Sequence, residues 1–438
     1  MSGNLLARTI SRKSFGEALG EEAFLGAMLA FESALAQSQA DAGIIPSDAA
    51  QAIEAACKKG DFSAAALAEQ GRLAGSLAIP LVKALTERVR VISPAAAAFV
   101  HYGSTSQDVL DTASMLCLRP CIAEADRVVG VCIAQLAEHA RKHAGTVMLG
   151  RTMMQPAIPI TAGVKIARWA TALSRCRARL AEASARALCV QLGGPVGTLD
   201  ALGSRRAEVR RAMAARLGLA DARAWHSHRD ELLSLAAELA ILVATIGKIA
   251  GDVALLAQAE IAEMQESAPK KGVGTSSAMP HKRNPVACLQ ALAASARAPA
   301  YLATMLGAKH EHERAIGGWQ AELATLPELV DTVGGALDAL ERISAGLQVD
   351  AGRMRRNLDS LQGLVFSEKL SRLLMQEMDR GSAQSQVDDW CSSAVEKHLP
   401  LEEIVRQARP DLDLAKLFSL EAVVNDLAPV LAEELAAI

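Results

Sequence analysis

Hydroxyl, amide and cationic side chains gather in three short segments of this chain, at positions 101–108, 150–157 and 270–285. The third segment is the most unusual, because glycines, hydroxyls and four Lys or Arg residues lie together in it, and it ends at Asn284–Pro285. Gly272 and Gly274 favour a mobile backbone, and Pro280 keeps the segment out of a helix. A mobile cationic loop that ends where a helix begins is suited to anions. The third segment therefore predicts an anion-binding site.

The other two segments also have a simpler explanation as helix starts. A helix that begins in the first segment can be capped by Ser104, Thr105 or Ser106. Asp108 suits the first turn of that helix. In the second segment, Pro156 suits the first position of a helix, with Gln155 just outside it. Three helix entrances with hydroxyl or amide donors predict one site for a polyanionic substrate, provided that the loops meet in space.

Several histidines are candidates for chemistry. His226–His228 and His310–His312 are closely spaced pairs, but alternate positions on a helix point to different faces, and no third ligand is spaced for zinc. We therefore predict no metal site. His101 and His281 lie in the polar segments, where each can donate a proton or bind a carboxylate, and we favour binding.

The elements that must position these segments are helical. Hydrophobic residues make up 51% of the 438 residues, with only 3% aromatic, and Ala and Leu are abundant. Ala and Leu favour helices, whereas strands favour β-branched and aromatic residues, so a nearly all-α protein is expected. Five long helices are predicted, over Gln107–His143, Pro156–Cys189, Arg229–Glu266, Pro285–Leu306 and Trp319–Ile343.

Breaks in the helical pattern divide the chain into three blocks. We predict an N-terminal helical domain at 1–100, a central long-helix bundle at 101–349 and a C-terminal helical domain at 350–438. Ile45–Pro46 marks a break in the first block, with Ser47 as a plausible cap for the next helix. The pattern after Arg229 is apolar around much of its circumference, which indicates burial by other subunits. A monomeric bundle is the alternative, and no fixed-period repeat supports a solenoid.

Composition excludes several classes of protein. A net charge of -3 with mixed signs and few aromatics gives no nucleic-acid surface. The apolar run 239–247 lies between Glu238 and Lys248 and is too short for a membrane span. The first residues show no secretory signal, and none of the eight cysteines forms a Cys-x-x-Cys pair. We expect a cytoplasmic protein with reduced, buried thiols and no membrane or nucleic-acid partner.

The segment Ser276-Ser-Ala-Met-Pro-His-Lys-Arg-Asn-Pro285 resembles the signature of the fumarase/aspartase superfamily, usually written G-S-S-x-M-P-x-K-x-N-P. The first segment resembles that family's Thr-Ser substrate segment, and Asp108-Val-Leu-Asp-Thr-Ala113 continues the pattern. The second resembles its Thr-His-x-Gln segment. The order and spacing of all three fit, so the resemblance covers most of the chain. It implies three helical domains and a homotetramer around a central multi-helix core, with each active site shared by three subunits.

The resemblance also implies roles for individual residues. Ser276 would be the catalytic base, and Lys282 would bind or polarise a substrate carboxylate together with Asn284. A serine base needs a strong positive potential, which Lys282, loop amides and the helix start at Asn284–Pro285 would supply. Residues expected to hold the substrate are His101, Ser104, Thr105, Ser106, Thr152, Gln155, Ser277, Met279, His281, Arg314 and Gln320. Trp319 is expected to pack or to shield the pocket. No cofactor is implied.

Two positions depart from the family pattern. Thr275 stands where the family has Gly, which puts the backbone shape of the serine loop in question. Met153 stands where adenylosuccinate lyases have a histidine acid, and a methionine cannot transfer a proton. An amine leaving group normally needs that acid, which contributes roughly two to four orders of magnitude in rate. A carboxylate, with a pKa near 4, leaves without one.

These departures favour one reaction. The segment from His312 to Glu322 resembles the carboxymuconate cycloisomerase branch of the superfamily and lacks the Ser-rich run of adenylosuccinate lyases. The resemblance implies a tricarboxylate substrate and lactonisation of 3-carboxy-cis,cis-muconate to 4-carboxymuconolactone, in protocatechuate catabolism, by addition–elimination through an aci-carboxylate. The competing hypotheses are another lyase of the superfamily, such as adenylosuccinate lyase, and a non-catalytic helical protein like the lens crystallins.

Overall fold

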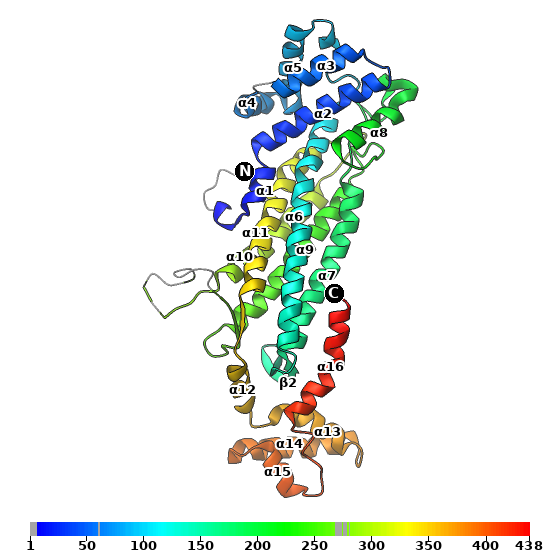
Figure 1. The fold of residues 1–438 in the computed structure, drawn as a ribbon. Helices are drawn as coiled ribbons and strands as arrows, with labels where there is room; N and C mark the ends of the chain where they lie inside the picture. The colour runs from blue at the N-terminus through cyan, green and yellow to red at the C-terminus, as the bar shows by residue number, and fades with distance from the viewer. Residues whose placement is uncertain (1–6, 60–61, 268–273, 275–277, 280) are drawn as a thin grey trace. The chain divides into compact units, whose positions relative to one another are not determined.

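The computed structural model describes residues 7–59, 62–267, 274, 278–279 and 281–438. Within these residues nearly all of the regular secondary structure is helical, as the composition predicts (Figure 1). It packs as two units, and five long helices run from one unit into the other. The first unit holds residues 1–128, 176–247 and 290–338, and the second holds 129–175, 248–289 and 339–438. The three predicted domains stay a prediction, because this division concerns packing and cuts through the long helices.

The long helices match the predicted ones closely at most ends. They are α6 (Ser106–Lys142), α7 (Ala162–Ala187), α9 (Asp230–Leu256), α10 (Val286–Gly307) and α11 (Gly318–Gly346). In the first unit α9 packs closely on α10, because a Cβ on Gly247 would lie 2.3 Å from the Ser295 hydroxyl. In the second unit α7 contacts α9 through Trp169, whose indole nitrogen donates to Asp252 at 2.9 Å. Side-chain contacts therefore join the long helices in each unit.

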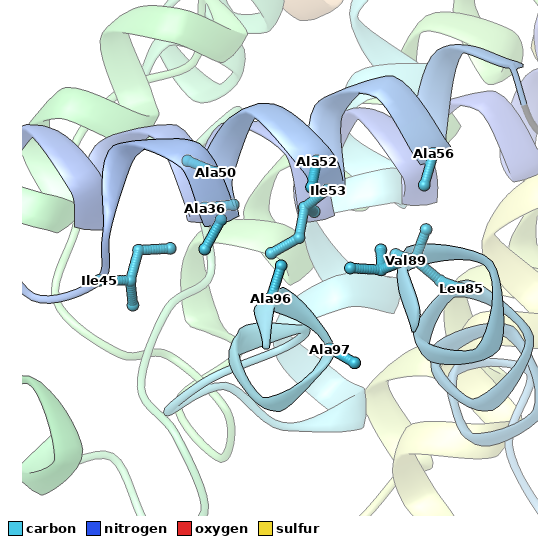
Figure 2. Close-up of a cluster of buried hydrophobic side chains, with 11 residues drawn as sticks. Ala36, Ile45, Ala50, Ala52, Ile53, Ala56, Leu85, Val89, Ala96 and Ala97 are labelled. Carbon is cyan, nitrogen blue, oxygen red and sulfur yellow. The ribbon is translucent and has the colours of Figure 1, made fainter. Parts of the chain in front are cut away.

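Short helices complete the first unit. They are α1 (Lys13–Ala18), α2 (Glu21–Asp41), α3 (Ser47–Lys59), α4 (Ala64–Ala74), α5 (Ala78–Ile92) and α8 (Arg206–Leu217), with 3-10 turns at Ala7–Ile10, Ala96–Phe99 and Asp200–Arg205. Helix α3 starts at Ser47 itself, so the predicted break is correct and the cap lies one residue earlier. A small core of Ala, Ile, Leu and Val side chains joins α2, α3, α5 and the 3-10 turn at 96–99 (Figure 2).

The second unit ends in short helices and contains the strands. The helices are α12 (Ala351–Asp359), α13 (Ser367–Leu374), α14 (Arg380–Lys397), α15 (Leu401–Ala408) and α16 (Leu420–Ala436), with a 3-10 turn at Leu364–Phe366. The strands β1 (Val147–Thr152) and β2 (Gln155–Thr161) form one antiparallel pair, and β3 (Met264–Glu266) and β4 (Leu347–Val349) form another. Carboxylate caps start two helices: Asp350 accepts from Arg353 N, and Asp379 accepts from Gly381 N.

Two predicted helices are wrong at one end. Pro156 does not start a helix, because Gln155 and Pro156 begin strand β2 and α7 starts only at Ala162. The hairpin turns through Met153 and Met154, whose φ angles are +49° and +65°. Positive φ at both central residues gives the hairpin turn that matches strand twist, although Asn-Gly is its usual sequence. The helix predicted to reach Glu266 ends at Leu256, and strand β3 follows it.

The cysteines are free thiols, as expected. Six of the eight are buried, and Cys57 and Cys391 are half-buried. Burial raises the pKa of Cys117 to about 11 and that of Cys121 to about 12. These thiols are therefore protonated at neutral pH and behave as small apolar groups.

Helix α9 is the described helix that is long and apolar enough to cross a membrane by length and composition. More than half of its apolar stretch is buried inside the protein, which is what a core helix shows. Lys248 within it forms an ion pair with Asp252. The packing therefore explains the apolar sequence without a bilayer.

Candidate active site

Asp108 organises the entrance to α6, where the first polar segment lies. Its carboxylate accepts hydrogen bonds from Thr105 N at 3.1 Å and from Ser104 Oγ at 3.3 Å. It also accepts from the backbone nitrogens of Gly193 and Gly194, each at 2.9 Å. Thr105 is the residue before the helix, so Asp108 closes half of a capping box. The sequence predicted a first-turn carboxylate here, but not one that is fully buried and holds a second loop.

A histidine completes the surroundings of Asp108. His226 Nε2 lies 2.7 Å from Asp108 Oδ1, and both side chains are buried. A Cβ on Gly193 would lie 2.5 Å from Cε1 of this ring, so a larger residue there would displace His226. His226 therefore serves the loop structure. Within the described residues, no group of three or more His, Cys, Asp or Glu side chains is placed to hold a metal.

The hydroxyl of Thr105 is engaged by a distant residue. Arg314 Nη1 donates to Thr105 Oγ1 at 2.7 Å, from the segment between α10 and α11. Thr105 is buried and Arg314 is half-buried. The structure thus brings together two residues that were predicted separately as substrate ligands. A guanidinium carries five N–H donors, so one bond to a hydroxyl leaves others for a carboxylate.

His101 lies at the start of the same loop, next to a buried carboxylate. Its Nδ1 is 2.6 Å from Glu32 Oε1 on α2, and Glu32 has no exposed side-chain surface. Burial alone lowers the pKa of His101, but the charge and hydrogen bond of Glu32 outweigh it and raise the pKa above its usual value. The ring therefore carries positive charge over a wider pH range than a free histidine. That charge suits the predicted role of binding a carboxylate.

A buried ionic cluster lies beneath this loop, and the sequence did not reveal it. Arg229 donates to both oxygens of Asp111, at 2.7 and 3.1 Å, and to Glu322 at 2.8 Å. His310 Nε2 is 2.9 Å from the other oxygen of Glu322. Burial opposes the charge of Arg229, but the two carboxylates still raise its pKa. Trp319 Nε1 donates to Asp111 Oδ1 at 3.0 Å.

One signal in the sequence could have pointed to this cluster. Asp111 falls on the same face of α6 as Asp108, beside the apolar residues Val109, Leu110 and Ala113. A carboxylate on a buried helix face requires a cationic partner. The partner, Arg229, lies more than a hundred residues away, so its identity depends on the fold. Of the predicted residues nearby, Ser106 is the first residue of α6, and Gln320 accepts from Gly317 N at 3.1 Å at the start of α11.

An apolar cavity adjoins the cluster. It has a volume of about 530 Å³, and Trp319 and Gln320 contribute to its wall together with Phe24, Leu77 and Leu323. Trp319 therefore lines the cavity and also donates to the buried carboxylate of Asp111. This placement agrees with the predicted packing role of Trp319.

The second polar segment is the tip of the β1–β2 hairpin in the second unit. Thr152 and Gln155 pair across the turn, and both side chains are exposed. Arg151 anchors the hairpin, because its guanidinium makes a bidentate pair with the buried carboxylate of Glu263 at 2.7 and 2.8 Å. The ion pair with Glu263 therefore holds the hairpin whose exposed tip carries Thr152, Met153 and Gln155.

The third segment belongs to the second unit as well. Thr275, Ser276 and Ser277 lie outside the described residues, so their predicted roles stay predictions. The described residues Met279, His281 and Lys282 are exposed, and Asn284 is half-buried. The backbone nitrogen of Asn284 donates to Gly274 O at 2.7 Å. The C-terminal part of the loop therefore folds back toward Gly274.

The start of α10 bears on one expectation about this loop. The helix begins at Val286, and its first amides, Ala287 N and Cys288 N, donate to the carboxylate of Glu266 at 2.9 Å each. The sequence suggested that the helix start at Asn284–Pro285 would supply positive potential to Ser276. Glu266 neutralises that helix end, because it satisfies the amides and adds a negative charge. The predicted contribution of Lys282 and the loop amides to a serine base stays a prediction.

Comparison with known proteins decides the family. A family model described as Lyase matches residues 8–299. The chain belongs to this lyase family. The lyase is 43% identical to the 3-carboxy-cis,cis-muconate cycloisomerase of Bradyrhizobium diazoefficiens, over 92% of this chain and 89% of that protein. It is 39% identical to the nitrosuccinate lyase of Streptomyces davaonensis, over 89% of this chain and 84% of that protein.

The fold of the lyase also has a solved counterpart. The crystal structure of the 3-carboxy-cis,cis-muconate lactonizing enzyme from Pseudomonas putida superposes with a TM-score of 0.91. The two are 37% identical, and the alignment covers 99% of this chain and 98% of that chain. The predicted membership of the fumarase/aspartase superfamily and the predicted all-α fold are therefore confirmed.

Proposed function

We propose that this lyase is a cycloisomerase that lactonises 3-carboxy-cis,cis-muconate to 4-carboxymuconolactone in protocatechuate catabolism. The observation that carries the proposal is the 43% identity to a cycloisomerase of that name over 92% of the chain. The 0.91 TM-score to a lactonizing enzyme supports it at the level of the fold. The exposed Met153 at the hairpin tip is consistent with a leaving group that needs no general acid.

The reaction is an addition to a double bond conjugated with a carboxylate. An oxygen of one substrate carboxylate bonds to the alkene carbon that is β to a second, conjugated carboxylate. The π electrons of the alkene move toward that second carboxylate, which gives an aci-carboxylate dianion. A proton then adds to the carbon beside that carboxylate. In the reverse direction Ser276 removes this proton, and the C–O bond breaks to release the carboxylate. Lys282 and Asn284 stabilise the dianion, as positive and hydrogen-bonding groups do for developing charge.

The remaining ligands come from the other two segments. In the first unit, His101 and Thr105 lie on one loop and Arg314 donates to Thr105, so these residues offer positive charge and a hydroxyl to the other carboxylates of the substrate. Thr152 and Gln155 lie at the hairpin tip of the second unit. We propose that the lyase forms a homotetramer in which the three segments of one site come from three subunits. No metal or organic cofactor takes part in this proposal.

A second candidate rests on the similarity to nitrosuccinate lyase. Eliminating nitrite is also a β-elimination beside a carboxylate, and nitrite, like a carboxylate, leaves as a stable anion. Met153 therefore argues against amine leaving groups but does not distinguish a lactone carboxylate from nitrite. The higher identity and the longer coverage favour the cycloisomerase.

Assays on the purified protein separate the candidates. We expect turnover of 3-carboxy-cis,cis-muconate, measured as loss of conjugated-diene absorbance, and little or none of nitrosuccinate or adenylosuccinate. Ser276→Ala should reduce kcat by about a thousandfold or more while the protein still binds substrate. Ser277→Ala, one residue along, is the matched control and should cost less.

Other outcomes have distinct meanings. Efficient fumarate release from adenylosuccinate or nitrosuccinate would replace the proposal with that lyase activity. A parent protein that turns over none of the three would favour the non-catalytic interpretation. A Ser276→Ala variant with full turnover would leave the fold assignment intact but remove the serine base.

A further inference from the structure

The segment between α10 and α11, residues 308–317, delivers Arg314 to the Thr105 hydroxyl. It has no regular secondary structure, so other contacts must define its path. One of these is a close approach between the backbone at the start of the segment and the first residue of α11. A Cβ on Gly318, the first residue of α11, would lie 2.0 Å from Lys309 O. The start of the segment therefore crosses over the start of α11, where only glycine fits.

His310 follows this crossing and is turned into the protein. Its side chain is only 7% exposed, and Nε2 lies 2.9 Å from Glu322 Oε1 on α11. A carboxylate only accepts, so the ring donates its Nε2 proton to Glu322. His310 Nδ1 is buried without a hydrogen-bond partner among the described residues. Among the described residues, the hydrogen bond to Glu322 is thus the one that the His310 ring makes. A different side chain with an N–H donor at this position can replace it.

Glu322 is itself fixed. Its second oxygen accepts from Arg229, which also binds both oxygens of Asp111 on α6. Asp111 lies about one and a half turns from Thr105, the residue that receives Arg314. Two sets of contacts therefore connect segment 308–317 to the start of α6. One runs from His310 through Glu322 and Arg229 to Asp111, and the other is the hydrogen bond from Arg314 to Thr105.

We propose that His310 is a positioning residue for substrate binding. Through Glu322 it fixes segment 308–317, and so it holds Arg314 against Thr105 with further N–H donors directed at a substrate carboxylate. The kinetic test of this inference rests on the proposed function, because it measures lactonisation. It assigns His310 a role that acts through Glu322 and Arg314.

A double-mutant cycle tests whether His310 acts through Arg314. Three variants are compared with the parent in the lactonisation assay: His310→Ala, Arg314→Met and the double variant. His310→Ala should raise the KM for 3-carboxy-cis,cis-muconate about tenfold and change kcat by less than about threefold, because a ground-state contact is loosened. With Arg314 already replaced, His310→Ala should have little further effect on kcat/KM.

A conservative replacement provides the matched control. His310→Gln keeps one N–H donor for Glu322 and should restore most of the parent KM. If the double variant loses kcat/KM by the product of the two single losses, His310 and Arg314 act independently. That result would overturn the proposal. Failure of His310→Gln to improve on His310→Ala would also count against it.

Hydrogen–deuterium exchange gives a second readout that does not depend on the reaction. Amides in 308–317 should exchange faster in His310→Ala than in the parent, and the His310→Gln variant should resemble the parent. If the parent lacks cycloisomerase activity, the proposed function fails and the exchange data still decide whether His310 fixes the segment. Unchanged exchange in His310→Ala would reject the positioning role whatever the substrate is.

Discussion

At the scale of single residues, the site depends on charged groups that were taken out of water and paired. His101 with Glu32, and Arg229 with Asp111 and Glu322, are the main examples. Removing one member of such a pair leaves an uncompensated buried charge, which is strongly destabilising. These pairs therefore fix the loop that carries Thr105, and they limit which substitutions the site tolerates.

The His101–Glu32 pair makes stability depend on pH. The pKa of His101 is raised in the folded protein, so its stabilising contribution is complete below the unfolded value of about 6.5. As pH rises through the folded pKa, the proton is released and the contribution is lost. We expect the parent to lose more unfolding free energy than His101→Gln between pH 6 and pH 9, as measured by urea denaturation at one protein concentration. Parallel losses in the two proteins would show that the pair does not titrate in this way.

At the scale of elements, the start of α10 shows how a helix is joined to the loop before it. Glu266 ends strand β3, and its carboxylate accepts from Ala287 N and Cys288 N. Strand β3 also pairs with β4, with Glu266 opposite Leu347, and just beyond the pair Ser267 N donates to Gly346 O at 2.7 Å. Both ends of the segment that contains Ser276 are therefore connected through one short strand.

This cap has a measurable contribution. Glu266→Ala should lower the free energy of unfolding by about 1–2 kcal/mol, because two helix amides lose their acceptor. Glu266→Gln keeps an acceptor oxygen and should cost less. The control is Glu260→Ala, since that side chain is exposed, and its unfolding curve in urea should match the parent's. Equal stability of Glu266→Ala and the parent would mean that water replaces the cap without loss.

The sequence predicts the elements unevenly, for physical reasons. The long helices were located to within a few residues at most ends, because Ala-rich and Leu-rich periodic stretches carry a strong local signal. The hairpin at Val147–Thr161 was missed, because Pro156 fits a helix start as well as a strand and the Met153–Met154 turn lacks glycine. Strands β3 and β4 are three residues each, and pairing between positions more than 80 residues apart leaves no local pattern.

At the scale of the whole molecule, the predicted residues fall into two groups. His101, Ser104, Thr105, Ser106, Arg314 and Gln320 belong to the first unit, and the hairpin and serine-loop residues belong to the second. Sequence could name these residues, because their motifs are local. It could not find Glu32, Arg229 or Glu322, because their roles arise only when distant segments pack. A site that needs both groups is served by the proposed assembly of several subunits.

Mixed assemblies test that proposal. Ser276→Ala and Thr105→Val each remove one segment's contribution, and each should be nearly inactive alone. Co-expressed or refolded together, they should recover about a quarter of the parent activity, because random mixing in a symmetric tetramer leaves that fraction of sites with both segments intact. The fraction is measured on the purified mixed tetramer. Mixtures no more active than the separate variants would place each site within one subunit.

The hairpin turn raises the question of why methionine stands at its two central positions. A left-handed conformation costs a non-glycine residue about 1–2 kcal/mol, and Met153 and Met154 both adopt it. Their side chains are 98% and 72% exposed, so packing within this chain returns little in exchange. Taken alone, the chain would be more stable with glycine at either place. We therefore predict that the two thioethers serve the proposed assembly of several chains and not the fold of their own chain.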